Sequence, residues 1–324
     1  MNILFIPCII DGAAPTSASV RFRAQWPARY WPGADVYPNQ ARQFADYDGY
    51  VFQKAYLSGR ASEMIGSLRA RDKLLAFDMC DADWLQSTKH EERLLEVLPL
   101  FDFAVSPTKA LQEWLARWVP AYVIPDRLDL EVMFERRYRC GHKPLSVVWF
   151  GYSHNLVELD MIWSDVAQIL DEYDLPLTII SDCLPPVWQD RTWGKNRKIQ
   201  FVTWTPERAD VEISTHTIAL VPQSSPYKSN NRTITAWALG LQTATSAKTL
   251  EKMLSWTWDV REIYLAQRQE EIRKHYDVHL SVKEWRDLFE VHRARQSLVR
   301  NSAFDHKRRG REIEEDRAVI HETI

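Results

Sequence analysis

The chain has 324 residues, which suits two medium-sized domains, with 45% hydrophobic and 26% charged residues and a formal net charge of −3. These values exclude a wholly basic protein that coats nucleic acid, although they are compatible with a local basic groove. With only 10 Gly and no run of about 18 apolar residues, we expect neither a Gly-rich phosphate loop nor a membrane span.

Short apolar runs alternate with amphipathic stretches in the first half of the chain. Strands are predicted at residues 2–6, 49–53, 74–79, 101–106 and 122–124, and helices at 19–31, 61–71 and 108–118. Pro27 is expected to start or kink the first helix, and Thr108 to cap the last. This alternation predicts parallel strands joined by crossover helices.

The same pattern restarts after a polar segment, residues 124–144, which is broken by Pro125, Gly141 and Pro144 and is interpreted as an interdomain linker. Strands are predicted at 145–150, 177–181, 199–203 and 217–222. Apolar residues from Leu159 to Ile169 predict one helix, and a further helix at 232–239 should end at Gly240.

Beyond Lys248 the pattern is helical, with a capping box at Ser281–Glu284 that predicts a helix start, and a charged tail from His306. We therefore predict an α/β protein with two Rossmann-like domains. The expected limits are 1–125 for the first domain, 126–144 for the linker, 145–255 for the second domain, and 256–324 for C-terminal helices and tail.

Ligands of open parallel sheets bind beyond the carboxyl ends of strands, where helix N-termini supply free N–H groups. In the second half, this rule selects Gly151, Tyr152, Ser153, Ser181, Asp182, Trp204, Pro222, Tyr227, Asn230 and Asn231. Lys228 and Arg232 lie in a loop that enters a helix, where cations and backbone donors can converge on a diphosphate. The alternative interpretation is a solvated loop whose charges are unrelated.

In the first half, the same rule selects Ser19, Arg21, Arg23, Gln53, Lys54, Asp78, Asp81 and Asp83. The last three place three carboxylates within six residues. Such a group is compatible with contacts to sugar hydroxyls, a catalytic base, a metal site or acidic caps at a helix start, and the sequence leaves these alternatives open.

Three stretches of the second half resemble the donor half of GT-B glycosyltransferases, most of all the large retaining family 4: VVWFGYSHN (147–155), FVTW (201–204) and IALVPQSSPYKSNNRTITAWALGLQTATS (218–246). The linker YVIPDRLDLEVMF (122–134) also resembles that family. The pieces SASVRFRA (17–24), VFQKAY (51–56) and FDMCDADW (77–84) resemble a short subgroup from bacteria and phages. The resemblance covers roughly residues 1–245.

The resemblance implies two Rossmann-like domains that face each other across a cleft, the GT-B fold, with C-terminal helices. It implies retaining transfer of a sugar from a nucleotide sugar, with a UDP-sugar as the expected donor, to a hydroxyl acceptor. No metal or other cofactor is expected. Lys228 and Arg232 are the residues we expect to stabilise the leaving diphosphate, and Asp78 and Asp81 are the catalytic candidates on the acceptor side.

Thr235 is implied to bind the donor with the other residues of the second half, and Ser19, Arg21, Arg23, Gln53, Lys54 and Asp83 are implied to bind the acceptor. Several positions depart from the family pattern. Thr235 and Tyr227 stand where the family carries acidic residues, Gln242 replaces the usual Pro, and the Arg–Lys pair after the first donor strand is absent. Thr235 can still bind a ribose hydroxyl, but without a charge-assisted bond.

The acceptor stays open between a surface glycan or lipid-linked sugar and a hydroxymethylated base in phage DNA. A non-catalytic nucleotide or glycan binder of the same fold is the alternative, and an epimerase is a third interpretation. The four cysteines form no CxxC pair, so neither a zinc site nor a disulfide framework is suggested, and a cytoplasmic location is expected.

Overall fold

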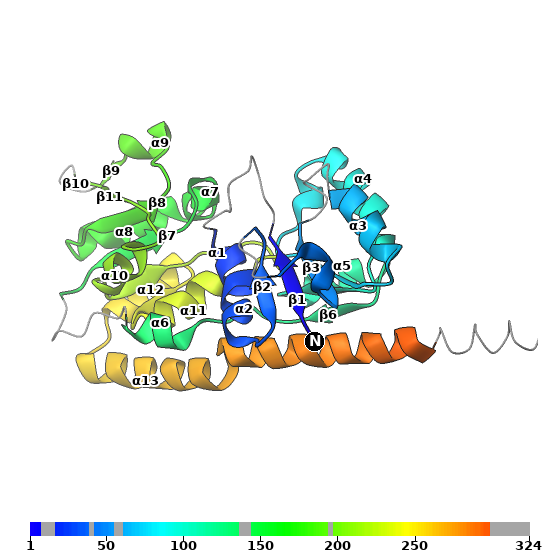
Figure 1. Ribbon diagram of the computed structural model, residues 1–324. Coiled ribbons are helices and arrows are strands. Elements are labelled where there is room, and N and C mark those ends of the chain that lie inside the picture. The colour runs from blue at the N-terminus through cyan, green and yellow to red at the C-terminus, as the bar shows by residue number, and fades with distance from the viewer. Residues whose placement is uncertain (8–16, 39–41, 55–60, 136–143, 194–196, 299–324) are drawn as a thin grey trace, which may run out of the picture.

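The protein is built around two parallel β-sheets, one from each half of the chain (Figure 1). The computed structural model describes residues 1–7, 17–38, 42–54, 61–135, 144–193 and 197–298. The first sheet is complete before residue 124 and the second begins after residue 146. This arrangement confirms the predicted α/β class with two Rossmann-like domains, whereas the proposed domain limits stay a prediction.

The first sheet has six strands in the order β2-β1-β3-β4-β5-β6, and all neighbouring pairs run parallel. Helices cover both faces of a parallel sheet, so its central strands are mostly apolar, and every residue of β3 and β4 is buried. The strands are β1 (Ile3–Ile6), β2 (Ala34–Val36), β3 (Gly49–Gln53), β4 (Leu74–Asp78), β5 (Phe103–Ser106) and β6 (Ala121–Val123).

The helices of this domain begin with three consecutive short segments, in which a π-helix separates two α-helices and Pro27 lies in the first turn of the third segment, as expected. Thr108 caps α5 by accepting the N–H of Leu111. The segments are α1 (Ala18–Val20), η1 (Arg21–Gln25), α2 (Trp26–Tyr30), η2 (Phe44–Asp46), α3 (Ala61–Arg69), η4 (Asp83–Leu85), α4 (Thr88–Val97), η5 (Leu98–Leu100) and α5 (Lys109–Leu115).

The second sheet has five parallel strands in the order β11-β8-β7-β12-β13. They are β7 (Val147–Phe150), β8 (Leu177–Ser181), β11 (Gln200–Thr203), β12 (Ile218–Leu220) and β13 (Gln242–Ala244), and a small antiparallel pair, β9 (Thr192–Trp193) and β10 (Arg197–Lys198), lies outside the sheet. The helical segments are η6 (Ser153–Asn155), α7 (Leu156–Asp160), α8 (Trp163–Glu172), α9 (Pro186–Gln189), α10 (Ala209–Ser214), α11 (Asn231–Ala238) and α12 (Ala247–Leu254).

Three sequence predictions about helices are corrected. The predicted linker contains α6 (Leu130–Glu135), which forms because Leu130 and Met133 are buried in the second domain's core. The single helix expected from Leu159 to Ile169 is two helices, α7 and α8, separated at Met161 and Ile162. A helix spans residues 278–298 and therefore begins three residues before the predicted capping box. Ser281 and Glu284 do not cap it, because their side chains bind Arg127.

The last two helices that the structure describes contact both domains. The first of them, α13 (Trp258–His275), contacts α11 of the second domain. The helix at 278–298 then passes under the first domain (Figure 1), where Trp285 and Phe289 pack against Phe103 with ring centroids 6.3 and 5.2 Å away. Full burial of an aromatic side chain of this kind stabilises the fold by roughly 1.5–3 kcal/mol.

A segment of the first domain also packs into the core of the second domain. The π-helix η1 and α2 follow β1 of the first domain, yet Phe22 and Trp26 are buried in the same apolar cluster as Phe150 and Ile213 of the second domain. The start of α2 is therefore part of the interdomain interface. This packing decides which side chains of residues 17–30 face the second domain.

Candidate site in the interdomain cleft

The central crevice of the second sheet lies where its strand order reverses. β7 and β12 are neighbours, but β8 lies beyond β7 and β13 beyond β12, so the connections leave toward opposite sides. A crevice opens at the carboxyl ends of two such strands. Gly151 follows β7 directly, and Val221 and Pro222 follow β12, so both segments border this crevice.

A cleft of about 500 Å³, open to solvent, lies between the two domains above this crevice. Residues that the sequence singled out in both halves line it together: Ser19, Gln53, Lys54, Asp81, Asp83, Gly151, Tyr152, Lys228, Asn231 and Arg232. The structure adds others, which the sequence analysis did not identify: Ser17, Gln86, His90, Asp126, His154, Asn155 and Ser229. Most of these are single polar residues in loops, and their positions follow no periodicity from which they could be found.

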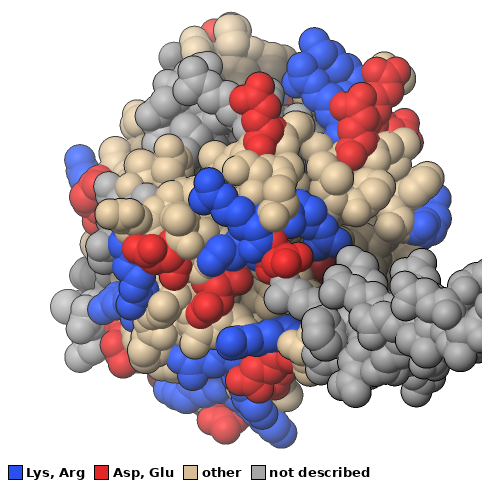
Figure 2. Space-filling model, turned by 45° about the vertical axis from the view of Figure 1, so that its right-hand side comes forward, with Lys and Arg blue, Asp and Glu red and all other residues tan. Residues whose placement is uncertain are grey.

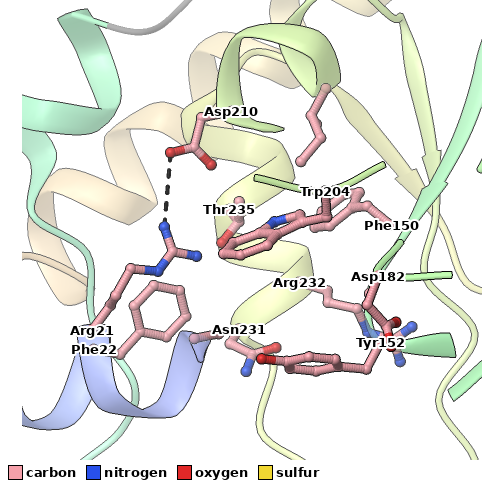
Figure 3. Close-up of a pocket in the computed structure, with 13 residues that line it drawn as sticks. Arg21, Phe22, Phe150, Tyr152, Asp182, Trp204, Asp210, Asn231, Arg232 and Thr235 are labelled. Carbon is pink, nitrogen blue, oxygen red and sulfur yellow. Dashed lines mark ion pairs between the residues drawn. The ribbon is translucent and has the colours of Figure 1, made fainter. Parts of the chain in front are cut away.

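A second pocket, with a cavity volume of about 90 Å³, adjoins the cleft and is more apolar (Figure 3). Its mostly apolar lining with a few polar groups is the usual character of small-molecule sites. The two cavities share Ala18, Gly151, Tyr152, Asn231 and Arg232. We call this second cavity the aromatic pocket; its other lining residues are Arg21, Phe22, Phe150, Asp182, Trp204, Asp210, Ile213 and Thr235.

Arg21 enters the aromatic pocket from the first domain. Its guanidinium lies 5.5 Å from the ring of Trp204, and Nη1 lies 4.0 Å from Oδ2 of Asp210 (Figure 3). Arg21 was predicted as an acceptor contact, but the structure places it beside the donor-half residues. The reason is that its neighbour Phe22 is buried in the second domain's core, which turns the π-helix η1 toward that domain.

Asp182 forms the polar side of the aromatic pocket. Its carboxylate accepts hydrogen bonds from the backbone N–H of Ser153 at 2.7 Å and from the hydroxyl of Ser181 at 2.9 Å. Burial opposes its ionisation, but these hydrogen bonds outweigh burial and lower the pKa of Asp182. Ser153 and Ser181 were predicted donor contacts; in the structure they orient this carboxylate and line neither cavity among the described residues.

Arg232 lies at the first turn of α11, where the helix presents free N–H groups to the cleft. Its Nη2 pairs with Glu158, which is 6% exposed, and donates to the carbonyl of Pro222 at 3.2 Å. Its Nη1 is buried without a hydrogen-bond partner among the described residues. Gly151 leaves space beside Arg232, because a Cβ at this position would lie 3.3 Å from the ring of Trp149 and 3.6 Å from the Cδ of Arg232.

Lysines and carboxylates from both domains meet in the cleft. The Nζ of Lys54 lies 2.7 Å from Asp81 and 3.0 Å from Asp83, while the Nζ of Lys228 lies 3.4 Å from Asp81 and 3.4 Å from the amide oxygen of Asn155. Burial raises the pKa of Asp81, but Lys54 and Lys228 outweigh it and hold that pKa well below its ordinary range. Asp81 is therefore an anion that accepts hydrogen bonds.

Arg23 and Asp78 do not reach the cleft surface. They are 3% and 1% exposed, and Nε and Nη2 of Arg23 donate to the carboxylate of Asp78 at 2.6 to 2.9 Å. The sequence predicted them as an acceptor contact and a catalytic carboxylate, but the structure brings them together as a buried ion pair beneath the cleft. Asp78 ends β4 inside the sheet, and so its side chain lies deeper than Asp81 and Asp83.

Four further predicted residues are placed as follows. Gln53 donates from Nε2 to the carbonyl of Ser19 at 3.1 Å, and both line the cleft. Tyr227 packs edge-on against Trp84 of the first domain, with ring centroids 5.4 Å apart, and lines neither cavity. Asn230 donates to the hydroxyl of Tyr276 at 3.0 Å and therefore supports the loop before α11.

Among the described residues, no group of three or more His, Cys, Asp or Glu side chains is arranged to hold a metal ion. Asp78, Asp81 and Asp83 instead pair with Arg23 or Lys54. None of the described helices combines the length and the apolar character that a bilayer crossing requires.

No protein-family model matches this chain, and no curated protein matches its sequence. Several solved structures share its fold. HepE of Anabaena, solved with UDP and glucose, is 12% identical with a TM-score of 0.63, and the match covers 90% of this chain and 99% of HepE. An α-glucosyltransferase solved with UDP is 10% identical with a TM-score of 0.64, over 88% of this chain and 98% of that enzyme.

The chain has the GT-B fold. An α-glucosyltransferase solved with UDP and a 13-mer DNA that contains an HMU base matches with a TM-score of 0.61 at 11% identity, over 89% of this chain and 98% of the other. A structure described as a UDP-N-acetylglucosamine 2-epimerase from Listeria monocytogenes matches at 10% identity with a TM-score of 0.51, over 91% and 97% of the two chains. At these identities the likeness shows the fold alone, and the activity must be argued from the site.

Proposed function

We propose that this protein transfers a sugar from a nucleotide-sugar donor, a UDP-sugar, to a hydroxyl acceptor. One observation carries the proposal: the aromatic pocket opens into the cleft at Gly151, Tyr152, Asn231 and Arg232. A planar base held between rings in the pocket would therefore direct its diphosphate toward Arg232 and the N-terminus of α11. A helix N-terminus with adjacent cations is a favourable site for a phosphate group.

The donor side of the reaction follows from the same geometry. Trp204 and Tyr152 provide surfaces for a base, and Thr235 provides a hydroxyl beside it for the ribose. Lys228 and Arg232 would stabilise the negative charge that develops on the leaving diphosphate. Structures of the same fold solved with UDP support this donor. Retention of the anomeric configuration, which the family 4 resemblance implies, is part of the proposal.

The acceptor would lie against the first domain, near Gln53, Lys54, Asp81 and Asp83. A saccharide is favoured over DNA by charge, because the only Lys or Arg among the described residues on this side of the cleft, Lys54, already pairs with two carboxylates. Acidic residues slightly outnumber basic ones in residues 1–125, and Figure 2 shows both signs interspersed on the face it displays. Affinity for DNA depends on Lys and Arg contacts to phosphates. The fold shared with an α-glucosyltransferase solved with DNA keeps hydroxymethylated DNA as the second candidate.

Calorimetric titration with UDP, GDP and ADP, followed by incubation of UDP-glucose and other UDP-sugars with acceptors, tests the proposal. We expect UDP to bind most tightly, and UDP release to rise when neutral oligosaccharides are added. The acceptor panel includes DNA that carries hydroxymethylcytosine, and NMR of the product reports retention or inversion. Binding of UDP without hydrolysis or transfer would support the non-catalytic binder, and binding of no nucleoside diphosphate would overturn the proposal.

A further inference from the structure

The buried guanidinium of Arg23 holds two carboxylates at once. Its Nε and Nη2 bind Asp78, while Nη1 donates to Oδ1 of Asp126 at 2.9 Å and to the carbonyl of Ile124 at 3.0 Å. Asp126 is 3% exposed and lies three residues after the end of β6, in the segment that joins the domains. With contacts on every side, Arg23 fixes the position of Asp126.

The second oxygen of Asp126 reaches the opposite domain. Oδ2 accepts a hydrogen bond from the hydroxyl of Ser229 at 2.6 Å, which is the length of a charge-assisted bond to a carboxylate. Ser229 follows Lys228 directly in the loop between β12 and α11. The backbone of Lys228 is thereby tied, through one residue, to a buried anchor that belongs to the first domain and the linker.

The ion pair of Arg23 with Asp78 is also connected to Lys228. Asp78 ends β4, and Asp81 follows three residues later and contacts the Nζ of Lys228 at 3.4 Å. That contact and the one to Asn155 are both long, and the side chain of Lys228 is 36% exposed. The side chain alone is therefore weakly held. The close contacts that locate Lys228 are made by its neighbours and backbone, Ser229 to Asp126 and the Lys228 carbonyl to Nε2 of Gln223 at 2.7 Å.

We propose that Asp126 and Ser229 are positioning residues: their hydrogen bond docks the loop of residues 222–230 on the first domain and sets Lys228 in place for the diphosphate. The inference rests on the proposed function, because that function assigns Lys228 to the diphosphate. Residues 221–230 have no helix or strand of their own. Without the anchor, the loop would have to be ordered when the nucleotide binds, and this entropy loss would weaken binding.

Ser229→Ala tests the anchor, with Ser229→Thr to restore the hydroxyl and Ser224→Ala, an exposed serine of the same loop, as the matched control. We expect Ser229→Ala to raise the Kd of UDP about tenfold, the size expected for one lost hydrogen bond. We expect Ser229→Thr to recover most of the affinity and Ser224→Ala to bind UDP as the unaltered protein does. Wild-type affinity in Ser229→Ala, or failure of Ser229→Thr to recover it, would overturn the inference.

A double-mutant cycle separates positioning of Lys228 from a general effect on the fold. If Ser229 acts through Lys228, then Ser229→Ala should add little to the loss of UDP affinity in a Lys228→Ala protein. Fully additive losses would contradict the inference, because they would show that Ser229 acts independently of Lys228. The proposed function fails separately, if the unaltered protein binds no UDP; the inference alone fails if UDP binds and the cycle is additive.

Discussion

The Nζ of Lys228 lies 3.4 Å from Oδ1 of Asp81, so a cation of the second domain's loop meets a carboxylate of the first domain across the cleft. Asp81 also pairs with Lys54 at 2.7 Å. A diphosphate carries more negative charge than one carboxylate and would compete with Asp81 for Lys228. Nucleotide binding and the arrangement of the acceptor-side charges are therefore expected to be linked.

Replacement of Lys228 by Ala should lower the rate of transfer from a UDP-sugar by about 100-fold or more, as removal of one preorganised charge stabiliser does. The melting temperature should change little, because the side chain is partly exposed and makes only long contacts. Steady-state kinetics and thermal unfolding measure the two effects. Lys109→Ala, which alters an exposed lysine on α5, is the matched control, and an unchanged rate for Lys228→Ala would remove this residue from the proposed site.

Trp204→Ala should weaken UDP binding by roughly 10- to 100-fold, because stacking of a base on an aromatic side chain contributes about 1–3 kcal/mol. Calorimetric titration with UDP measures the change. Trp118, which is 48% exposed and does not line the aromatic pocket, provides the control substitution Trp118→Ala. Equal UDP affinity for Trp204→Ala and the unaltered protein would mean that the base binds elsewhere.

The lowered pKa of Asp81 predicts a pH dependence of stability. Burial raises this pKa, but Lys54 and Lys228 outweigh burial, so the folded protein keeps the carboxylate ionised below its ordinary pKa of 3.8. A group with a lowered folded pKa contributes stability that is present above the unfolded value and is lost as the pH falls through the folded value. Asp81→Asn should therefore reduce the fall in melting temperature between about pH 5 and about pH 2. Parallel curves for the two proteins would contradict the assigned charge pair.

Asp78→Asn should lower the free energy of unfolding by about 3–5 kcal/mol, because it leaves the buried charge of Arg23 without its main counterion. Urea unfolding measures this change. Glu113→Gln, which removes a carboxylate from an exposed pair on α5, should change it by less than about 1 kcal/mol. A small effect for Asp78→Asn would indicate that Asp126 alone satisfies Arg23.

Most of the strands could be predicted, because the strands of a parallel sheet are short apolar runs that can be identified in the sequence without knowledge of distant residues. The runs that became β3, β4, β7 and β8 illustrate this. β2 (ADV) and β13 (QTA) were missed because polar residues interrupt these three-residue strands, so neither forms an apolar run. The helix α6 was missed because the polar and Pro-containing segment around it outweighed Leu130 and Met133, whose burial depends on the second domain.

For the candidate site, the order of strands and the residues that follow them were enough to place Lys228, Arg232, Asp81 and Lys54 near one cleft. The residues that hold the site's side chains in place could not be predicted. Glu158 beneath Arg232, and Asp126 beneath Ser229, lie 74 and 103 residues from their partners along the chain. Contacts over such separations leave no local periodicity in the sequence.

Arg21 and Arg23 separate what the amino-acid sequence determined by itself from what the tertiary structure decided. The sequence determined that both arginines follow the first strand of a parallel sheet, and so lie at the edge where ligands bind. The tertiary structure decided that Arg21 faces Trp204 in the aromatic pocket while Arg23 is buried with Asp78 and Asp126. Arg21 and Arg23 lie two residues apart on a helical segment, so their side chains point in different directions. The packing of the two domains then decides which groups each side chain contacts.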